Sequence, residues 1–280
     1  MDLSAILLPV ATIGGLGLLF GGGLGFAAIK FAVPVDERVT DILENLPGAN
    51  CGGCGKAGCE AMAKAMVAGE CSASSCPVCN AEQVAAIAKI LGVEASTSEK
   101  KVAYVKCQGS HENAKQKFEY DGIMTCQDAQ LVGGGSKMCA YGCLGYGSCE
   151  KACPFGAIHM ENGLPVIDRS VCTGCGACEM QCPRHVIEVI PASSNYHVNC
   201  ISQDKGKAVK EACKVGCIGC GLCMKQCEHG AICVENSHAK IQYDLCIGCG
   251  KCEVKCPTKA ITHLLEQKEE SIATEQSSLA

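Results

Sequence analysis

Nine cysteines recur 74 residues further along this chain, and this repeat constrains its fold more than any other feature. A shift of 74 residues places each of them on another cysteine without a gap, beginning with Cys126 on Cys200. A fixed period of this kind indicates one structural module present twice. We therefore expect two tandem modules, at 126–190 and 191–263.

The second half of each module carries the run C-x2-C-x2-C-x3-C-P. Bacterial ferredoxins bind [4Fe–4S] clusters with this run, and in two-cluster ferredoxins its fourth Cys ligates the other cluster. A zinc site would need neither the third Cys nor the Pro. The run comprises Cys172, Cys175, Cys178 and Cys182 in the first module and Cys246, Cys249, Cys252 and Cys256 in the second.

The first half of each module matches less well between the copies. The second module has a complete run of Cys217, Cys220, Cys223 and Cys227. The first module has Tyr146 in place of Cys220, and its thiols are Cys139, Cys143, Cys149 and Cys153. We therefore expect Cys139 to supply the missing ligand, which leaves its repeat partner Cys213 surplus.

Applying the ligand exchange to both modules predicts four clusters. Their ligand sets are Cys139, Cys143, Cys149 and Cys182; Cys172, Cys175, Cys178 and Cys153; Cys217, Cys220, Cys223 and Cys256; and Cys246, Cys249, Cys252 and Cys227. Between the runs, two short β-prone stretches flank a turn in each module, at Asn162-Gly163 and Asn236-Ser237, so each module should contain a hairpin. Short helices should begin near Cys178 and Cys252.

A further cysteine box precedes the repeat. Its spacing is Cys51-x2-Cys54-x4-Cys59-x16-Cys76, on a loop rich in Gly. Four thiolates in such a run can hold one Fe–S cluster, and glycines allow the loop to curl tightly around it. A structural zinc site is the alternative, since four-cysteine zinc sites also use C-x2-C pairs.

The chain has 27 Cys, of which these five predicted clusters use 20. Seven remain: Cys71, Cys79, Cys107, Cys126, Cys200, Cys213 and Cys233. Two interpretations stay open for Cys107, Cys126, Cys200 and Cys213, namely a sixth cluster between the modules or buried structural thiols. The cofactor prediction is therefore five [4Fe–4S] clusters, with a sixth open, and no flavin or NAD on this chain.

The N-terminus predicts a membrane anchor. No charged residue occurs from Leu3 to Ile29, and a helix of about 20 apolar residues crosses a bilayer. Lys30 and Arg38 follow this stretch, and basic residues favour the cytoplasmic flank. The cytoplasm is reducing, which keeps thiols free for metal. A cleaved signal sequence is the weaker alternative.

We therefore predict an α+β chain with a single transmembrane helix, a small helical [4Fe–4S] domain and two ferredoxin-like modules. The remaining boundaries are 1–33 for the anchor, 34–91 for the helical domain with helices near 35–46 and 81–91, 92–125 for a linker and small segment, and 264–280 for a disordered tail.

The composition excludes several classes of function. A net charge of −5 and a pI near 5.8 argue against a nucleic-acid-binding protein. The sequence contains no convincing nucleophile–base pair, phosphate loop or nicotinamide site, so we predict no catalytic residue. Several one-electron carriers in series without a substrate site indicate an electron relay.

The anchor, the CGGC-x4-C-x16-C box and the ferredoxin modules together resemble the B subunit of the Rnf complex, an ion-translocating ferredoxin:NAD oxidoreductase, in its extended clostridial form. The resemblance implies a protein that takes electrons from ferredoxin and passes them to other membrane subunits, with its cysteine-rich bulk on the cytoplasmic side of the cell (inner) membrane. NAD reduction and Na⁺ or H⁺ pumping would occur on those partners. The chain departs from the family at Glu228, where Pro is usual, and at Cys79.

A basic face near the cluster ligands would suit an acidic ferredoxin, although a merely solvated face is the alternative. Its residues are Lys151, Lys225, Lys251, Lys255 and Lys259. Two other functions remain open: an electron-transfer subunit of a hydrogenase or formate dehydrogenase, and a structural zinc protein.

Overall fold

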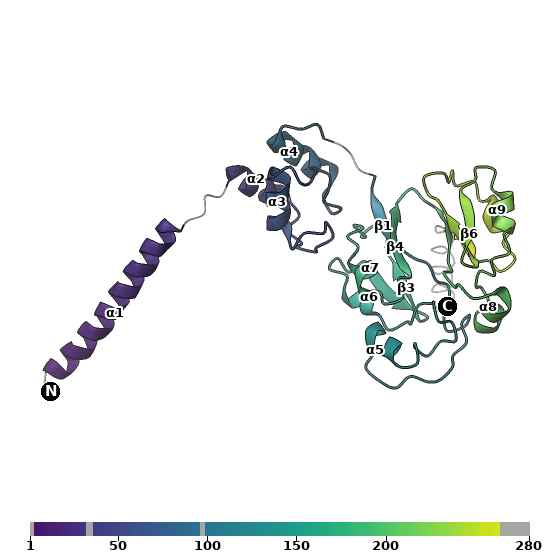
Figure 1. Cartoon of the computed structure of the whole chain (residues 1–280), viewed down its shortest axis with the longest axis horizontal. Helices are drawn as coiled ribbons and strands as arrows, with labels where there is room; N and C mark the ends of the chain where they lie inside the picture. The colour runs from purple at the N-terminus through teal and green to yellow at the C-terminus, as the bar shows by residue number, and fades with distance from the viewer. Residues whose placement is uncertain (1–2, 32–35, 96–98, 264–280) are drawn as a thin grey trace, which may run out of the picture.

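The structure is a computed structural model that describes residues 3–31, 36–95 and 99–263 (Figure 1). The first element is the 28-residue helix α1 (Leu3–Lys30), which confirms the helix expected there. Its part Thr12–Lys30 is long and apolar enough to cross a membrane, and none of it is buried against the rest of the chain. The predicted tail at 264–280 lies outside the described residues.

A small helical domain follows α1. It consists of α2 (Glu37–Asn45), α3 (Cys59–Val67) and α4 (Ala81–Leu91). Apolar residues at helical spacing meet in its core, where Ile42, Met62, Met66 and Ile87 are almost fully buried. Helix α4 covers the stretch expected from the sequence because both of its ends are specified. Asn80 and Gln83 form a capping box at its start, and Gly92 ends it in the left-handed conformation.

The first ferredoxin-like module is built from short elements around one core. Strand β1 (Lys101–Val105) pairs antiparallel with β4 (Ile187–Pro191), and β2 (Ile158–Glu161) pairs with β3 (Leu164–Ile167). The short helices are α5 (Cys126–Leu131), α6 (Ser148–Lys151) and α7 (Ala177–Gln181).

The second module repeats this plan. Strands β6 (Ile232–Glu235) and β7 (His238–Ile241) form its hairpin, and β5 (Tyr196–Val198) pairs with β8 (Ile261–His263). Its helices are α8 (Gly206–Ala212), α9 (Leu222–Gln226) and α10 (Lys251–Val254).

Both predicted hairpins are confirmed, and the geometry of their turns accounts for the Asn, Gly and Ser residues at the central turn positions. The backbone is left-handed at both central positions of each turn, Asn162-Gly163 and Asn236-Ser237. This is the type I′ geometry that suits the twist of a two-residue hairpin and favours Asn and Gly. The helices expected near Cys178 and Cys252 are also present, as α7 and α10.

The segment expected to be a linker contributes to the module core. Val102, Ala103 and Tyr104 of β1 are buried among the first module's apolar side chains. Residues 107–118 then run to the second module, where the Lys115 N–H donates to the Ala212 carbonyl at 2.9 Å and the Lys214 N–H donates to the Asn113 carbonyl at 2.9 Å. The two modules are thus joined by backbone hydrogen bonds.

A buried aromatic group adds to this junction. His197 of β5 is fully buried, and its ring lies 4.2 Å from that of Tyr104. Its Nε2 donates to the Ser194 carbonyl at 3.1 Å, because a carbonyl can only accept, which leaves Nδ1 to accept from the Tyr243 hydroxyl at 2.9 Å.

Candidate cluster sites

The N-terminal box closes around one cavity. Its lining includes the four predicted ligands Cys51, Cys54, Cys59 and Cys76. The Cys59 N–H donates to Asn50 Oδ1 at 2.8 Å, which fixes the start of α3 beside the loop. A hydrogen bond with the Cys79 thiol lowers the pKa of Cys76 to about 6. Cys79 therefore lies beside the box and interacts with one of its thiols.

The second module contains two such cavities, each lined by four thiols. Cys217, Cys220, Cys223 and Cys256 line the first, and Cys227, Cys246, Cys249 and Cys252 line the second. In each cavity three thiols come from one run and the fourth from the other run, which is the exchange that the sequence predicts. The Ala239 N–H donates to Cys217 Sγ at 3.4 Å, and the Ala260 N–H donates to Cys256 Sγ at 3.2 Å.

The first module places its second run in the core beside β1. Cys172 and Cys178 are buried there, with Cys153 packed against the same cluster of side chains. The Ala103 N–H donates to Cys172 Sγ at 3.3 Å, and the Ala157 N–H donates to Cys153 Sγ at 3.4 Å.

The other cavity of the first module contains an unexpected thiol. Cys143, Cys149 and Cys182 line it together with Cys126, whereas Cys139 is not among its lining residues. Cys126 begins α5, and its N–H donates to Ser148 Oγ at 2.8 Å. The structure thus places Cys126 where the sequence interpretation places Cys139.

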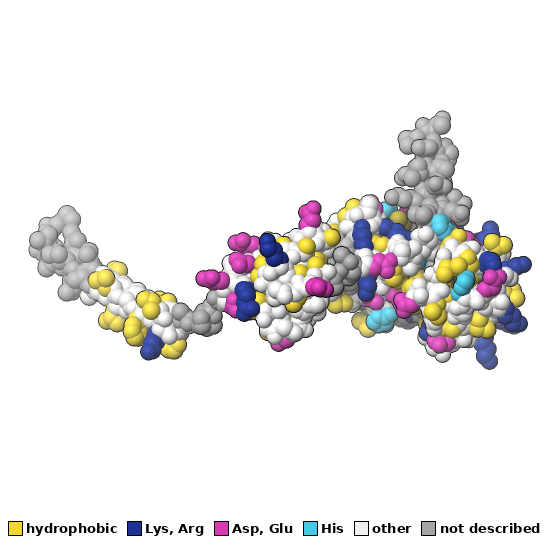
Figure 2. Space-filling model, turned by 90° about the horizontal axis from the view of Figure 1, so that it is seen from above, with side chains coloured by type: hydrophobic (Ala, Val, Ile, Leu, Met, Phe, Trp, Pro, Cys, Tyr) yellow, Lys and Arg dark blue, Asp and Glu magenta, His cyan; other side chains and the backbone are white. Residues whose placement is uncertain are grey.

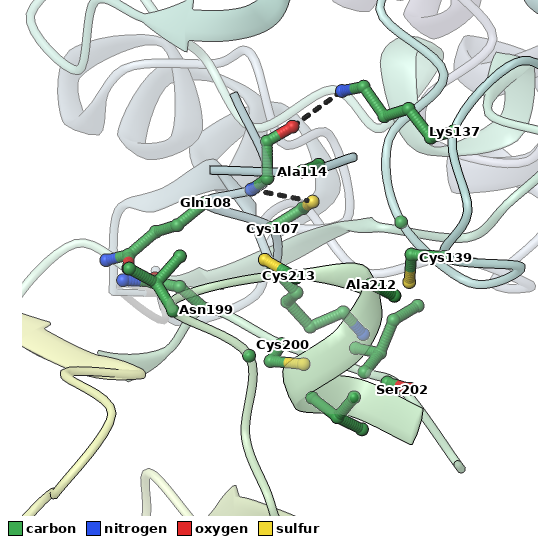
Figure 3. A pocket seen from close by; sticks show the side chains of 17 residues that line it. Cys107, Gln108, Ala114, Lys137, Cys139, Asn199, Cys200, Ser202, Ala212 and Cys213 are labelled. Carbon is green, nitrogen blue, oxygen red and sulfur yellow. Dashed lines mark hydrogen bonds between the residues drawn. The ribbon is translucent and has the colours of Figure 1, made fainter. Parts of the chain in front are cut away.

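Cys139 lies instead in a cavity between the two modules (Figure 3). Three other cysteines line this cavity: Cys107, Cys200 and Cys213. Three of the four residues suggested by the sequence for a sixth cluster are therefore together, with Cys139 in place of Cys126. Repeat spacing cannot distinguish these two thiols, because both recur in the second module.

Burial shapes the electrostatics of these thiols. Removal from water raises the pKa of Cys178 and Cys200 to about 12 and that of Cys149 to about 11. The thiolate forms would therefore need a positively charged group in the cavity. Among the described residues, no three His, Cys, Asp or Glu side chains converge closely enough to hold one metal ion.

The structure also shows a contact between two cluster loops that the sequence does not reveal. The backbone of Gly53, in the N-terminal box, lies directly against the backbone of Cys175 in the first module. A Cβ added to Gly53 would lie 2.2 Å from the Cys175 carbonyl oxygen. Glycine at this position thus allows the helical domain to contact a ligand loop of the first module.

Comparison with known proteins agrees with this geometry. Residues 46–78 match a family described as a putative Fe–S cluster, and residues 165–188 and 239–262 each match the 4Fe–4S binding domain. The first match covers the N-terminal box, and the other two cover the second run of each module.

Relatives match most of the chain. The B subunit of the Na(+)-translocating ferredoxin:NAD(+) oxidoreductase complex of Acetobacterium woodii is 47% identical over 243 residues, which are 86% of this chain and 73% of that protein. This chain belongs to the family of Rnf complex B subunits. The B subunit of the ion-translocating oxidoreductase complex of Methanosarcina acetivorans is 42% identical over 92% of this chain and 98% of its own length. The B subunit of the proton-translocating ferredoxin:NAD(+) oxidoreductase complex of Clostridium ljungdahlii is 47% identical over 88% and 86%. The resemblance stated from the motifs is therefore confirmed.

Proposed function

We propose that this chain is a membrane-anchored iron–sulfur relay that takes electrons from reduced ferredoxin and passes them within an ion-translocating ferredoxin:NAD(+) oxidoreductase complex. The observation that carries the proposal is the pair of four-thiol cavities in the second module, assembled by the exchange typical of two-cluster ferredoxins. The names of the family relatives support the same function.

Five [4Fe–4S] clusters would be held by the cavities described above and by the buried second run of the first module. One site has Cys51, Cys54, Cys59 and Cys76; a second has Cys172, Cys175, Cys178 and Cys153; a third has Cys217, Cys220, Cys223 and Cys256; and a fourth has Cys246, Cys249, Cys252 and Cys227. The fifth site has Cys143, Cys149 and Cys182, and Cys126 lines the same cavity. When bound, each cluster accepts and releases one electron. The chain's own residues supply thiolates, hydrogen bonds to sulfur and exclusion of water.

Electrons would enter at the second module. Cys220 and Cys249 are exposed, whereas Cys175, the repeat equivalent of Cys249 in the first module, is buried. Lys and Arg side chains gather at this end of the molecule, while Asp and Glu side chains lie over the helical domain (Figure 2). Exposed ligand cysteines near positive charge suit the docking of an acidic ferredoxin, because complementary charge raises the rate of encounter.

Electrons would leave through the N-terminal box. The contact of Gly53 with Cys175 places this box beside the first module. The box is also the cluster site closest in sequence to α1, which would anchor the chain beside the membrane subunits of the complex. Lys30 at the end of α1 and Arg38 beyond it favour the cytoplasmic side for the rest of the chain.

The function can be tested with the full chain purified anaerobically in detergent. We expect iron and acid-labile sulfide in equal amounts, and reduction of the protein by reduced ferredoxin. Zinc in place of iron would overturn the relay. For the docking face, Lys255→Gln/Lys259→Gln should slow reduction by ferredoxin at low salt and reduce its salt dependence. Lys89→Gln, at an exposed position of α4 in the helical domain, is the control and should leave both the rate and its salt dependence unchanged.

A further inference from the structure

Three of the four thiols between the modules lie close to the backbone of Gly142 or Gly109. A Cβ built on Gly142 would lie 3.4 Å from both Cys107 Sγ and Cys139 Sγ. A Cβ built on Gly109 would lie 3.4 Å from Cys107 Sγ and 4.0 Å from Cys213 Sγ. Cys107 thus lies between Cys139 and Cys213, and Cys200 lines the same cavity from the second module (Figure 3).

The cavity has the character of the four-thiol sites already described. Its volume is about 30 Å³, compared with about 10 Å³ at the Cys217 site and about 20 Å³ at the Cys246 site, so it has at least as much room. The N–H groups of Gly109 and Cys143 both donate to Cys107 Sγ at 3.3 Å. Backbone donors to ligand sulfur also occur at the predicted ferredoxin-type sites, and such bonds tune Fe–S clusters.

A buried positive charge lies beside this cavity. The Lys137 side chain is 3% exposed, and its Nζ donates to the carbonyls of Gly109 at 2.6 Å and Gly163 at 3.4 Å. No described carboxylate forms an ion pair with it. Burying an ammonium group without a negative partner is unfavourable. A cluster held by four thiolates carries net negative charge and would supply that partner.

The repeat explains why four thiols are available here. In the second module Cys220 completes the set of four thiols at its cavity, so neither Cys200 nor Cys213 is needed as a ligand there. In the first module Tyr146 replaces that ligand, Cys126 takes its place, and Cys139 is released. Cys107, outside the repeat, adds the fourth thiol.

We propose that this cavity holds a sixth [4Fe–4S] cluster ligated by Cys107, Cys139, Cys200 and Cys213, and that Cys126 completes the cluster of Cys143, Cys149 and Cys182. The inference rests on the proposed relay function, since it assumes that the chain carries iron–sulfur clusters. It adds a carrier whose ligands come from both modules, and it exchanges the roles that the sequence gives to Cys126 and Cys139.

Two double variants of the full chain test this exchange. Cys139→Ala/Cys200→Ala removes two ligands of one proposed cluster and should lose about four Fe per chain. Cys126→Ala/Cys200→Ala removes ligands of two clusters and should lose about eight. The grouping read from the sequence predicts the opposite order. Cys233→Ala is the control, since Cys233 lies on β6 and lines none of the cavities described above, and it should keep all iron.

The iron content of the unmodified chain, counted by native mass spectrometry and by iron and sulfide analysis, separates the two levels of proposal. About 24 Fe per chain fits six clusters, and this count holds even where a double variant fails to fold. About 20 Fe, with no loss in Cys200→Ala, would overturn the sixth cluster and leave the relay intact. A chain without iron would overturn the relay itself. A loss of about eight Fe in Cys139→Ala/Cys200→Ala with only four in Cys126→Ala/Cys200→Ala would overturn the ligand exchange.

Discussion

Substitution of Gly53 by Ala should weaken the contact between the helical domain and the first module. The new Cβ would lie 2.2 Å from the Cys175 oxygen and 2.9 Å from its carbonyl carbon, whereas ordinary contacts begin at 3.4 Å. Both are backbone atoms, so the two loops must separate by about 1 Å. Overpacking of this kind costs about 1–3 kcal/mol. Since 1.4 kcal/mol is a factor of ten, the docked arrangement should lose roughly 5- to 150-fold in its equilibrium constant.

Hydrogen exchange measured by mass spectrometry reports this separation. In Gly53→Ala, amides of both 51–58 and 172–178 should exchange faster, because each loop loses the other's cover. The iron content should stay unchanged, since Gly53 has no positive φ that Ala would strain. Ferredoxin-driven NAD(+) reduction by the assembled complex should slow if electrons cross this contact.

Gly55→Ala is the matched control in the same loop. Gly55 has a φ of +77° and nothing within 4 Å of its added Cβ, so Ala there strains the loop without touching the first module. Exchange should then rise within 51–58 alone. Unchanged exchange at 172–178 in Gly53→Ala, or the same pattern in both variants, would refute the contact as the point where the two domains meet.

Three further predictions concern stability and the cluster sites. Ala at Gly174 would have a φ of +68° and a Cβ 2.5 Å from the Lys101 oxygen, so Gly174→Ala should lower the free energy of unfolding by about 2–5 kcal/mol. Gly176→Ala is the control, because its added Cβ meets open space, and it should lower this free energy by about 1–2 kcal/mol. Anaerobic guanidinium titration measures both changes. Ser148→Ala leaves the buried Cys126 N–H without its acceptor and should lower the free energy of unfolding by about 1–3 kcal/mol. The iron of one cluster should also be lost, and an unchanged iron content would contradict the placement of Cys126. Burial lowers the pKa of His197 to about 4, so below pH 6.5 the unfolded chain binds a proton that the folded chain does not. The free energy of unfolding should therefore fall by about 2 kcal/mol from pH 7 to pH 5. In His197→Asn, guanidinium titration should show a weaker dependence of this free energy on pH.

Local signals in the sequence predicted much of this fold because they act within a few residues. The capping box at Asn80 and the glycine at 92 bound α4, and the Asn-Gly turn at 162 sets a hairpin. Strand β1 was missed for the opposite reason. Its five residues carry no clear period, and its partner β4 lies more than 80 residues away, so only tertiary pairing defines it.

The same limit applies to the cluster sites. In the second module each run supplies three thiols to one cavity, and spacing alone brings them together. The choice between Cys126 and Cys139 depends on distant partners. Ser148 binds the Cys126 backbone, and the path of residues 107–118 brings Cys107 toward Cys139. Neither contact can be inferred from the spacing of the repeated cysteines.

The backbone hydrogen bonds that join residues 107–118 to the second module have a consequence for kinetics. With Lys115 bonded to Ala212 and Asn113 to Lys214, the two modules cannot swing apart without breaking ladder-like bonds between them. Tunnelling distances within this pair are therefore set by the fold and not by diffusion of one module relative to the other. Electron exchange between the modules should proceed at a rate independent of solvent viscosity, whereas the encounter with ferredoxin should slow as viscosity rises.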